Sequence, residues 1–234
     1  MASVATCPLE DSLGLQLPQH LEFRKQMRSL RQTVPPELAA EATRAVKQLL
    51  LDEPVIQEAS SIAVYAATDG EVDVSDIATW AQENAKRVFF PAMRHDVPPA
   101  IQQEVPKPTK PARIAFVEWL PGANWIQGAF NIPEPAGGEE ISIEDCDTAL
   151  VPGVVFDRNA NRIGRGKGYY DKALAFLAQG TRPRPPVLFG VCHDFQIVDE
   201  MATPITSKDI HMDAIVSPSG IIWKSETQEQ ASCA

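Results

Sequence analysis

The chain has 234 residues, of which 44% are hydrophobic and 22% charged, and it carries a formal net charge of −10. These fractions are those of a folded globular protein, which excludes a disordered, collagen-like or coiled-coil chain. A field of this sign repels nucleic acid and anionic lipid, so any anionic ligand must bind at a local basic patch.

The spacing of the cysteines and the shortness of the apolar runs indicate the cellular compartment. The four cysteines form no CxxC pair and the four histidines are scattered, which argues against a disulfide framework or a zinc site. No apolar run approaches the length of a membrane span, about eighteen residues. The first residues, MASVATCPLEDSLG, lack the basic and apolar regions of a signal peptide. We expect a cytoplasmic protein without a membrane-spanning segment.

The first folded element expected is an amphipathic helix over residues 21–34. Its apolar positions are Phe23, Met27, Leu30 and Val34, and its basic positions are Arg24, Arg28 and Arg31. Arg24 and Arg28, one turn apart, could clamp an oligophosphate if the helix packs beside a binding crevice, or the basic face could simply be solvated. Pro35 and Pro36 end the helix, and the apolar period of residues 38–49 predicts a second one.

The rest of the chain alternates between strand-like and helix-like segments. Strands are expected at residues 61–67, 87–91, 112–119, 147–155, 186–192 and 213–218, and further helices at 74–84 and 169–177. Prolines within residues 97–112 predict an extended surface loop. The alternation predicts one open, largely parallel α/β sheet, with residues 1–19 as a leader that need not be ordered and residues 20–234 as a single domain.

The loop after the strand at 147–155 holds the strongest chemical signal. Glycines at 164, 166 and 168 alternate with Arg165 and Lys167, next to Arg162 and just before a helix. Uncovered backbone N–H groups at a helix N-terminus bind anions. A Walker A loop is excluded because Gly168 follows the Gly-Lys pair, and the spacing does not fit a dinucleotide fingerprint. The loop is predicted to bind phosphate or carboxylate, the alternative being a turn with solvated cations.

Three acids and one further arginine stand near the ends of strands. Glu71 follows the first strand and could be solvated or could accept N–H donors of a heterocycle. Asp171 lies in a first helical turn, where the helix dipole favours it and where it could share Mg²⁺ with a phosphate. Arg94 is expected in a loop after the strand at 87–91, and Asp213 stands at the start of a strand.

Several runs, in this order along the chain, are similar to the 5-formyltetrahydrofolate cyclo-ligase family, also called methenyltetrahydrofolate synthetase. They are RKQMRSLR, the acid-bearing turn after SIAVYAA, FNIPEP, ALVPGVVFDRNANRIGRGKGYYD and DAIVSPSGI. The resemblance covers about residues 20 to 220, and RIGRGKGYYD is its most specific part. Arg24 departs from the family, in which lysine is common at that position.

The resemblance implies an ATP- and Mg²⁺-dependent ligase on a Rossmann-like three-layer α/β fold, an open and mostly parallel sheet with helices on both faces. Its reaction would convert 5-formyltetrahydrofolate into 5,10-methenyltetrahydrofolate, with release of ADP and phosphate, through a phosphorylated formyl (iminium phosphate) intermediate. The substrate could carry a polyglutamate tail, and a monomer without nucleic-acid or membrane partners is expected. The alternative is a non-catalytic paralogue that binds folate or nucleotide.

The resemblance also implies roles for particular residues. ATP would be bound by Arg24, Lys25, Gln26, Met27, Arg28, Arg162, Ile163, Gly164, Arg165, Gly166, Lys167, Gly168, Tyr169 and Tyr170. The folate would be bound by Glu71, Arg165, Gly166, Lys167, Gly168 and Tyr169. Lys167 and Arg165 would be catalytic, and Asp171 and Asp213 would hold Mg²⁺.

Overall fold

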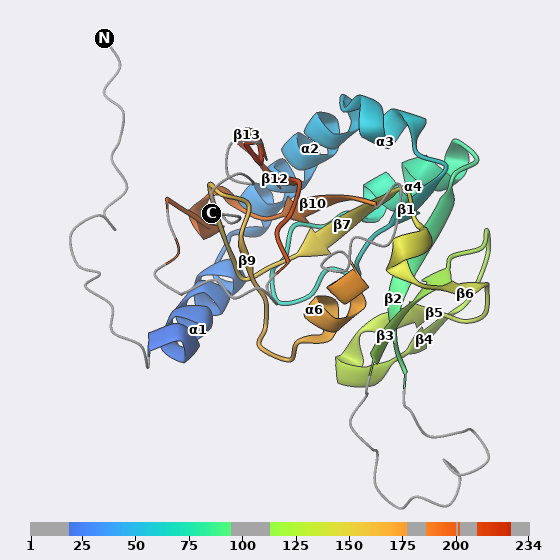
Figure 1. Cartoon of the computed structure of the whole chain (residues 1–234), viewed down its shortest axis with the longest axis horizontal. Helices are drawn as coiled ribbons and strands as arrows, with labels where there is room; N and C mark the ends of the chain where they lie inside the picture. Colours follow the sequence, from blue (N-terminus) through green and yellow to red (C-terminus); the bar gives the residue numbers. More distant parts are fainter. Residues whose placement is uncertain (1–18, 95–112, 177–185, 200, 202–209, 226–234) are drawn as a thin grey trace, which may run out of the picture.

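The core of the protein is an eight-stranded sheet in the order β13-β12-β10-β7-β1-β2-β3-β6. The computed structural model describes residues 19–94, 113–176, 186–199, 201 and 210–225 (Figure 1). The strands of the sheet are β13 (Gly220–Trp223), β12 (Ala214–Ser217), β10 (Val187–Val191), β7 (Thr148–Pro152), β1 (Ser61–Ala63), β2 (Arg87–Arg94), β3 (Arg113–Glu118) and β6 (Glu140–Ile141). The five strands from β12 to β2 run parallel, and β13, β3 and β6 pair antiparallel at the two edges.

One face of the sheet is covered by α2 (Pro36–Leu51), α3 (Pro54–Glu58) and α4 (Ser75–Glu83). Side chains alternate along each strand, so Ile62 and Val88 point to this face and pack with Leu50 of α2. A proline at the start of α2 and of α3 suits the first helical turn, where no backbone N–H is needed.

The other face is covered by α6 (Tyr169–Ala173) and by the segment that follows β7. Ala63 and Phe89 point to this side and share a cluster with Phe156 and Leu174. Two small sheets complete this layer and the adjoining edge, one of β11 (Ile197–Val198), β8 (Val155–Asp157) and β9 (Arg162–Ile163), the other of β4 (Trp125–Gln127) and β5 (Pro133–Pro135). Figure 1 shows α2 and α6 on opposite sides of the sheet, and α1 (Gln19–Gln32) beside its carboxyl ends.

The predicted fold class is confirmed, and three element predictions need correction. Arg94 is not in a loop, because β2 continues to that residue, where it pairs antiparallel with β3. β1 has three residues instead of the expected seven. α6 ends at Ala173, and residue 177 lies outside the described residues, as do residues 1–18 and the proline-rich segment 97–112. No helix in the described part of the chain is long and apolar enough to cross a membrane.

Candidate active site

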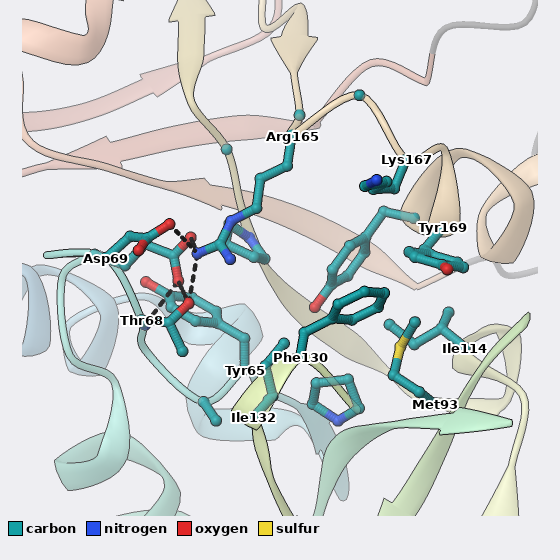
Figure 2. Close-up of a pocket in the computed structure, with 18 of the residues that line it drawn as sticks. Tyr65, Thr68, Asp69, Met93, Ile114, Phe130, Ile132, Arg165, Lys167 and Tyr169 are labelled. Carbon is teal, nitrogen blue, oxygen red and sulfur yellow. Dashed lines mark hydrogen bonds and ion pairs between the residues drawn. The ribbon is translucent and has the colours of Figure 1, made fainter. Parts of the chain in front are cut away.

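A cavity of about 490 Å³ opens at the carboxyl ends of β1 and β7. Its walls are the turn after β1, the glycine loop that leads into α6, and an apolar side from β2, β3 and the segment before β5 (Figure 2). Pro152, the last residue of β7, and Gly153 after it also line the cavity. The lining residues include Arg28, Tyr65, Thr68, Asp69, Glu71, Met93, Ile114, Phe130, Ile132, Pro152, Gly153, Arg162, Gly164, Arg165, Gly166, Lys167, Gly168, Tyr169, Tyr170 and Asp171. The carboxyl edge of a parallel sheet is where ligands of open α/β folds bind.

The glycine loop, residues 164–168, runs from β9 to the first turn of α6 along this cavity. Gly166 and Gly168 adopt positive φ angles of 80° and 68°, which side-chain-bearing residues rarely adopt. A Cβ at Gly166 would lie 3.3 Å from Nη1 of Arg24, so α1 packs directly behind the loop. Successive uncovered amides beside arginine and lysine side chains form an anion-binding wall.

Most charges in the cavity are paired. Arg28 Nη2 lies 2.6 Å from Asp69 Oδ2, and Arg165 Nη2 lies 3.0 Å from Glu71 Oε1. Arg162 pairs with Asp171. Figure 2 shows Arg165 reaching across to Thr68 and Asp69, while Lys167 and Tyr169 lie on the side of Ile114. No ion pair of Lys167 occurs among the described residues, so this lysine offers an uncompensated charge.

Glu71 is held in place from two sides. Its side chain is 8% exposed, which excludes a solvated acid, and its Oε2 accepts the N–H of Thr68 at 3.0 Å. Desolvation acts against the ionisation of the neighbouring Asp69, but the hydrogen bond from Arg28 and the charge of Arg165 outweigh it, so the pKa of Asp69 is lowered. Asp69 therefore stays a charged partner of the glycine-loop arginine at neutral pH.

Aromatic side chains form the other wall. The rings of Phe130 and Tyr169 are 6.0 Å apart between centroids, and Phe130 is 55% exposed. The hydroxyl of Tyr170 is buried and has no hydrogen-bond partner among the described residues. Burial, and then the charge of Glu71, raise the pKa of Tyr170, so its phenol stays a donor. The cavity thus combines a wall of glycine-loop amides and basic side chains, which suits an anion, with a face suited to a flat ring.

A family model described as the 5-formyltetrahydrofolate cyclo-ligase family matches residues 17–218, most of the chain. The chain belongs to the 5-formyltetrahydrofolate cyclo-ligase family. Family membership confirms the resemblance and the predicted enzyme class, an ATP-dependent cyclo-ligase, and it does not favour the non-catalytic alternative.

Named cyclo-ligases and solved structures of this family resemble the chain over most of its length. The 5-formyltetrahydrofolate cyclo-ligase of Escherichia coli K12 is 25% identical over 200 residues, covering 85% of this chain and 99% of that protein. A probable cyclo-ligase of Caenorhabditis elegans is 28% identical, covering 83% and 90%. The 5,10-methenyltetrahydrofolate synthetase of Aquifex aeolicus has a TM-score of 0.70 at 24% identity, covering 91% of this chain and 98% of that chain. The Mycoplasma pneumoniae synthetase, with a TM-score of 0.59 at 23% identity and coverages of 84% and 97%, shares the same fold.

The structure does not bring every residue implied by the cyclo-ligase resemblance to the cavity. Met27 is buried and packs with Ile163 in a small apolar cluster behind the glycine loop. Lys25 and Gln26 are exposed on α1 and do not line the cavity. Asp213 accepts the N–H of Leu188 at 2.7 Å, at the amino end of β12. It lies at the amino ends of the parallel strands β12, β10 and β7, whereas Asp171 lines the cavity at their carboxyl ends.

Of the two acids expected to hold Mg²⁺, only Asp171 lies at the cavity. Asp171 lines the cavity and its side chain is 45% exposed. No group of three or more His, Cys, Asp or Glu side chains occurs within the described ranges. Mg²⁺ is often held by one or two carboxylates together with substrate phosphates and water, so Asp171 beside the glycine loop fits the ion.

The structure places three further residues in or directly behind the cavity to which the sequence alone gives no role in the site. Phe130 lies in FNIPEP, but nothing in that run indicates that its ring faces a cavity. Asp69 directly precedes the predicted turn glycine, and its pairing with Arg28 spans 41 residues. Arg31 was recognised as one of the basic positions of the first helix, yet its complete burial could not be read from the helical period.

Proposed function

We propose that this cavity converts 5-formyltetrahydrofolate into 5,10-methenyltetrahydrofolate, with ATP converted to ADP and phosphate. The observation that carries the proposal is the meeting of two unlike walls in one cavity: the glycine loop with Arg165 and Lys167, and the aromatic wall with Glu71. A reaction that transfers phosphate to a folate needs both.

The nucleotide would lie along the glycine loop. Its phosphates would accept hydrogen bonds from the loop amides and from Lys167, Arg165 and Arg162, and Arg24 and Arg28 would add positive charge from α1. Tyr170 would donate a hydrogen bond from its buried hydroxyl to the ligand. Phosphoryl transfer depends on alignment and on neutralisation of charge more than on a protein nucleophile, and these side chains supply both.

The folate would lie between Glu71 and the rings of Phe130 and Tyr169. Glu71 would accept N–H groups of the pterin ring. Residues 165–169 would stand between the two ligands and bring the formyl oxygen to the terminal phosphate. Holding two reactants in line accounts for a large part of such a rate enhancement.

The chemistry follows from the poor leaving ability of a formamide oxygen. The formyl oxygen attacks the γ-phosphorus as its bond to ADP breaks, which gives an iminium phosphate. The anilino nitrogen N10 then attacks the formyl carbon and loses its proton, and the C–O bond breaks to release phosphate as the ring closes. Lys167 and Arg165 neutralise the oxygens of the group in transfer.

Finer properties belong to the same proposal. Asp171 would hold Mg²⁺, which would supply positive charge to stabilise the phosphates. The enzyme would act as a monomer in the cytoplasm, with 5-formyltetrahydrofolate or its polyglutamylated forms as substrate.

The direct test is incubation of the purified chain with 5-formyltetrahydrofolate, MgCl₂ and ATP while methenyl absorbance and ADP are followed together. We expect one ADP for each methenyltetrahydrofolate formed, and no product when ATP is omitted. If the protein binds folate but consumes no ATP, the proposed reaction is wrong and the protein is a non-catalytic paralogue.

A further inference from the structure

Arg31, in the last turn of α1, is the most deeply buried charge behind the cavity. Its side chain is 1% exposed and it is not among the lining residues. Burial lowers the pKa of Arg31 and the charge of Glu71 opposes this, but an arginine remains protonated at any physiological pH. A buried charge of this kind is costly unless it is paired and hydrogen-bonded, so its partners are informative.

The guanidinium of Arg31 joins two separate walls of the cavity. Its Nε donates to the carbonyl oxygen of Asp69 at 3.0 Å, in the turn after β1. Its Nη1 donates to the carbonyl oxygen of Gly153 at 3.0 Å, in the turn after β7. One planar group with several donors thus fixes two loops that are far apart in the sequence.

Glu71 stands within reach of the same guanidinium. Nη1 of Arg31 lies 3.5 Å from Glu71 Oε1, the oxygen that also pairs with Arg165 at 3.0 Å. The two arginines differ in their surroundings, because the side chain of Arg165 is 34% exposed and belongs to the glycine loop. Arg31 is 1% exposed and does not line the cavity, so it pairs with Glu71 from the side away from the cavity.

The turn that carries Glu71 is also pressed against the end of α1. A Cβ at Gly70 would lie 2.5 Å from the carbonyl oxygen of Arg31, so backbone meets backbone there. His193 holds the same turn from another element, since its Nε2 lies 3.0 Å from the carbonyl oxygen of Gly70. The contacts of Arg31 therefore lie in a place where the turn has little freedom to adjust.

We propose that Arg31 is a positioning residue, which fixes the Glu71 carboxylate and the turn around it so that Glu71 meets the folate without reorganisation. The inference rests on the proposed function, in which Glu71 contacts the folate. Arg31 itself touches neither ligand. Its contribution is preorganisation, which lowers the cost of binding without adding a contact to the ligand.

The test is a double-mutant cycle between Arg31 and Glu71, with affinity for 5-formyltetrahydrofolate measured by calorimetry in the absence of nucleotide. Arg31→Met removes the charge and keeps an apolar side chain of similar length. We expect it to weaken folate binding by about 30-fold or more, since breaking a buried pair has a large cost. In the Glu71→Gln background the same change should weaken binding by less than about threefold, because coupled residues lose their shared effect only once.

Two further measurements separate positioning from general damage. Affinity for a non-hydrolysable ATP analogue with Mg²⁺ should change by less than about threefold in Arg31→Met, since the glycine loop is intact. Arg31→Lys keeps the charge but cannot donate to both carbonyl oxygens, so its folate affinity should lie between those of wild type and Arg31→Met. Arg44→Met is the matched control, an exposed arginine on α2 whose removal should leave folate affinity unchanged.

The outcomes are distinct. Wild-type protein that binds no 5-formyltetrahydrofolate ends the proposed function, and this inference with it. If the wild type binds folate, either of two results overturns this inference and leaves the proposed function standing. One is an Arg31→Met variant that binds folate as tightly as the wild type. The other is a loss of folate affinity by Arg31→Met that is as large in the Glu71→Gln background as in the wild type. If Arg31→Met does not melt cooperatively, the cycle is run with Arg31→Lys, whose smaller weakening of folate binding should likewise disappear in the Glu71→Gln background. Failure of both variants to fold would make Arg31 a structural residue and would equally overturn the inference.

Discussion

Lys167 is the residue whose charge and position give the most direct test of the proposed phosphoryl transfer. It lines the cavity, its side chain is exposed, and no ion pair of it occurs in the described part of the chain. Removing one charge that stabilises a transition state typically lowers kcat by about 10²- to 10³-fold. We expect a loss of that size for Lys167→Ala in the methenyl absorbance assay, with an unchanged melting temperature.

The matched control for Lys167 is Lys172, an exposed lysine of α6 that lines a different cavity. Lys172→Ala should keep wild-type kcat. Equal losses in the two variants would point to a general effect of basic charge on this loop and helix, and an active Lys167→Ala would remove the lysine from the mechanism.

Asp171 combines two roles that a substitution can separate. In the structure it pairs with Arg162, and in the proposed complex it would hold Mg²⁺. Asp171→Asn should therefore raise the Mg²⁺ concentration needed for half-maximal activity by about tenfold or more, because a neutral amide is a poor ligand for a hard cation. Asp76→Asn, at an exposed acid of α4, serves as the control. Unaltered Mg²⁺ dependence in Asp171→Asn would exclude this carboxylate as the ligand.

At the scale of elements, the turn between β1 and α4 is the most constrained. Gly70 has a φ of +70°, and a Cβ there would lie 2.5 Å from the carbonyl oxygen of Arg31. Gly70→Ala should lower the free energy of unfolding by about 2–3 kcal/mol, from backbone strain together with the displacement of α1. It should also weaken folate binding, because Glu71 moves with the turn. Urea denaturation and calorimetry measure the two effects.

Gly122 provides the comparison, since its φ is +75° and a Cβ there would meet nothing within 4 Å. Gly122→Ala should have only the conformational cost, about 1 kcal/mol. If Gly70→Ala were no more destabilising than Gly122→Ala, the close packing of the turn on α1 would not be a source of stability.

Local patterns predicted those elements whose signal lies within one segment. The helices near residues 21–34 and 38–49 and the glycine loop were expected correctly, because helical period, proline and glycine act over a few residues. The continuation of β2 to Arg94 was missed, since Pro91 argues against a strand and only pairing with β3 reveals it. The burial of Arg31 also depends on contacts with distant parts of the chain, the turns that follow β1 and β7, so the helical period does not reveal it.

For the whole molecule, alternation of strand-like and helix-like segments was sufficient to predict the open parallel sheet. Glu71 and the glycine loop each follow a strand of this sheet in the sequence, and the structure has both at the carboxyl ends of the strands. The alternation could not place Asp213 relative to Asp171, because that requires the direction of β12 and the side of the sheet at which each residue lies. A residue at the start of a parallel strand and one after the end of a neighbouring strand are separated by about the length of a strand.

Cooperative unfolding of the sheet and its two covering layers can be followed through the two buried cysteines. Cys146 and Cys192 both pack on the side of the sheet that carries α6. Burial raises the pKa of Cys146 to about 12 and raises that of Cys192 as well, so both thiols are neutral and unreactive in the folded state at pH 8. Labelling should therefore require unfolding.

If residues 20–234 form one domain, as expected from the sequence, both cysteines should react with iodoacetamide at the same slow rate, since one opening event exposes both. Cys7 and Cys233, outside the described residues, are replaced by serine, and labelling is followed by mass spectrometry of the peptides. Mg-ATP at 100 times its Kd stabilises the native state by about 2.7 kcal/mol, so it should slow both reactions about 100-fold. Faster labelling of one cysteine, or protection of only one by nucleotide, would show that the two ends of this face open independently and that the sheet is not a single cooperative unit.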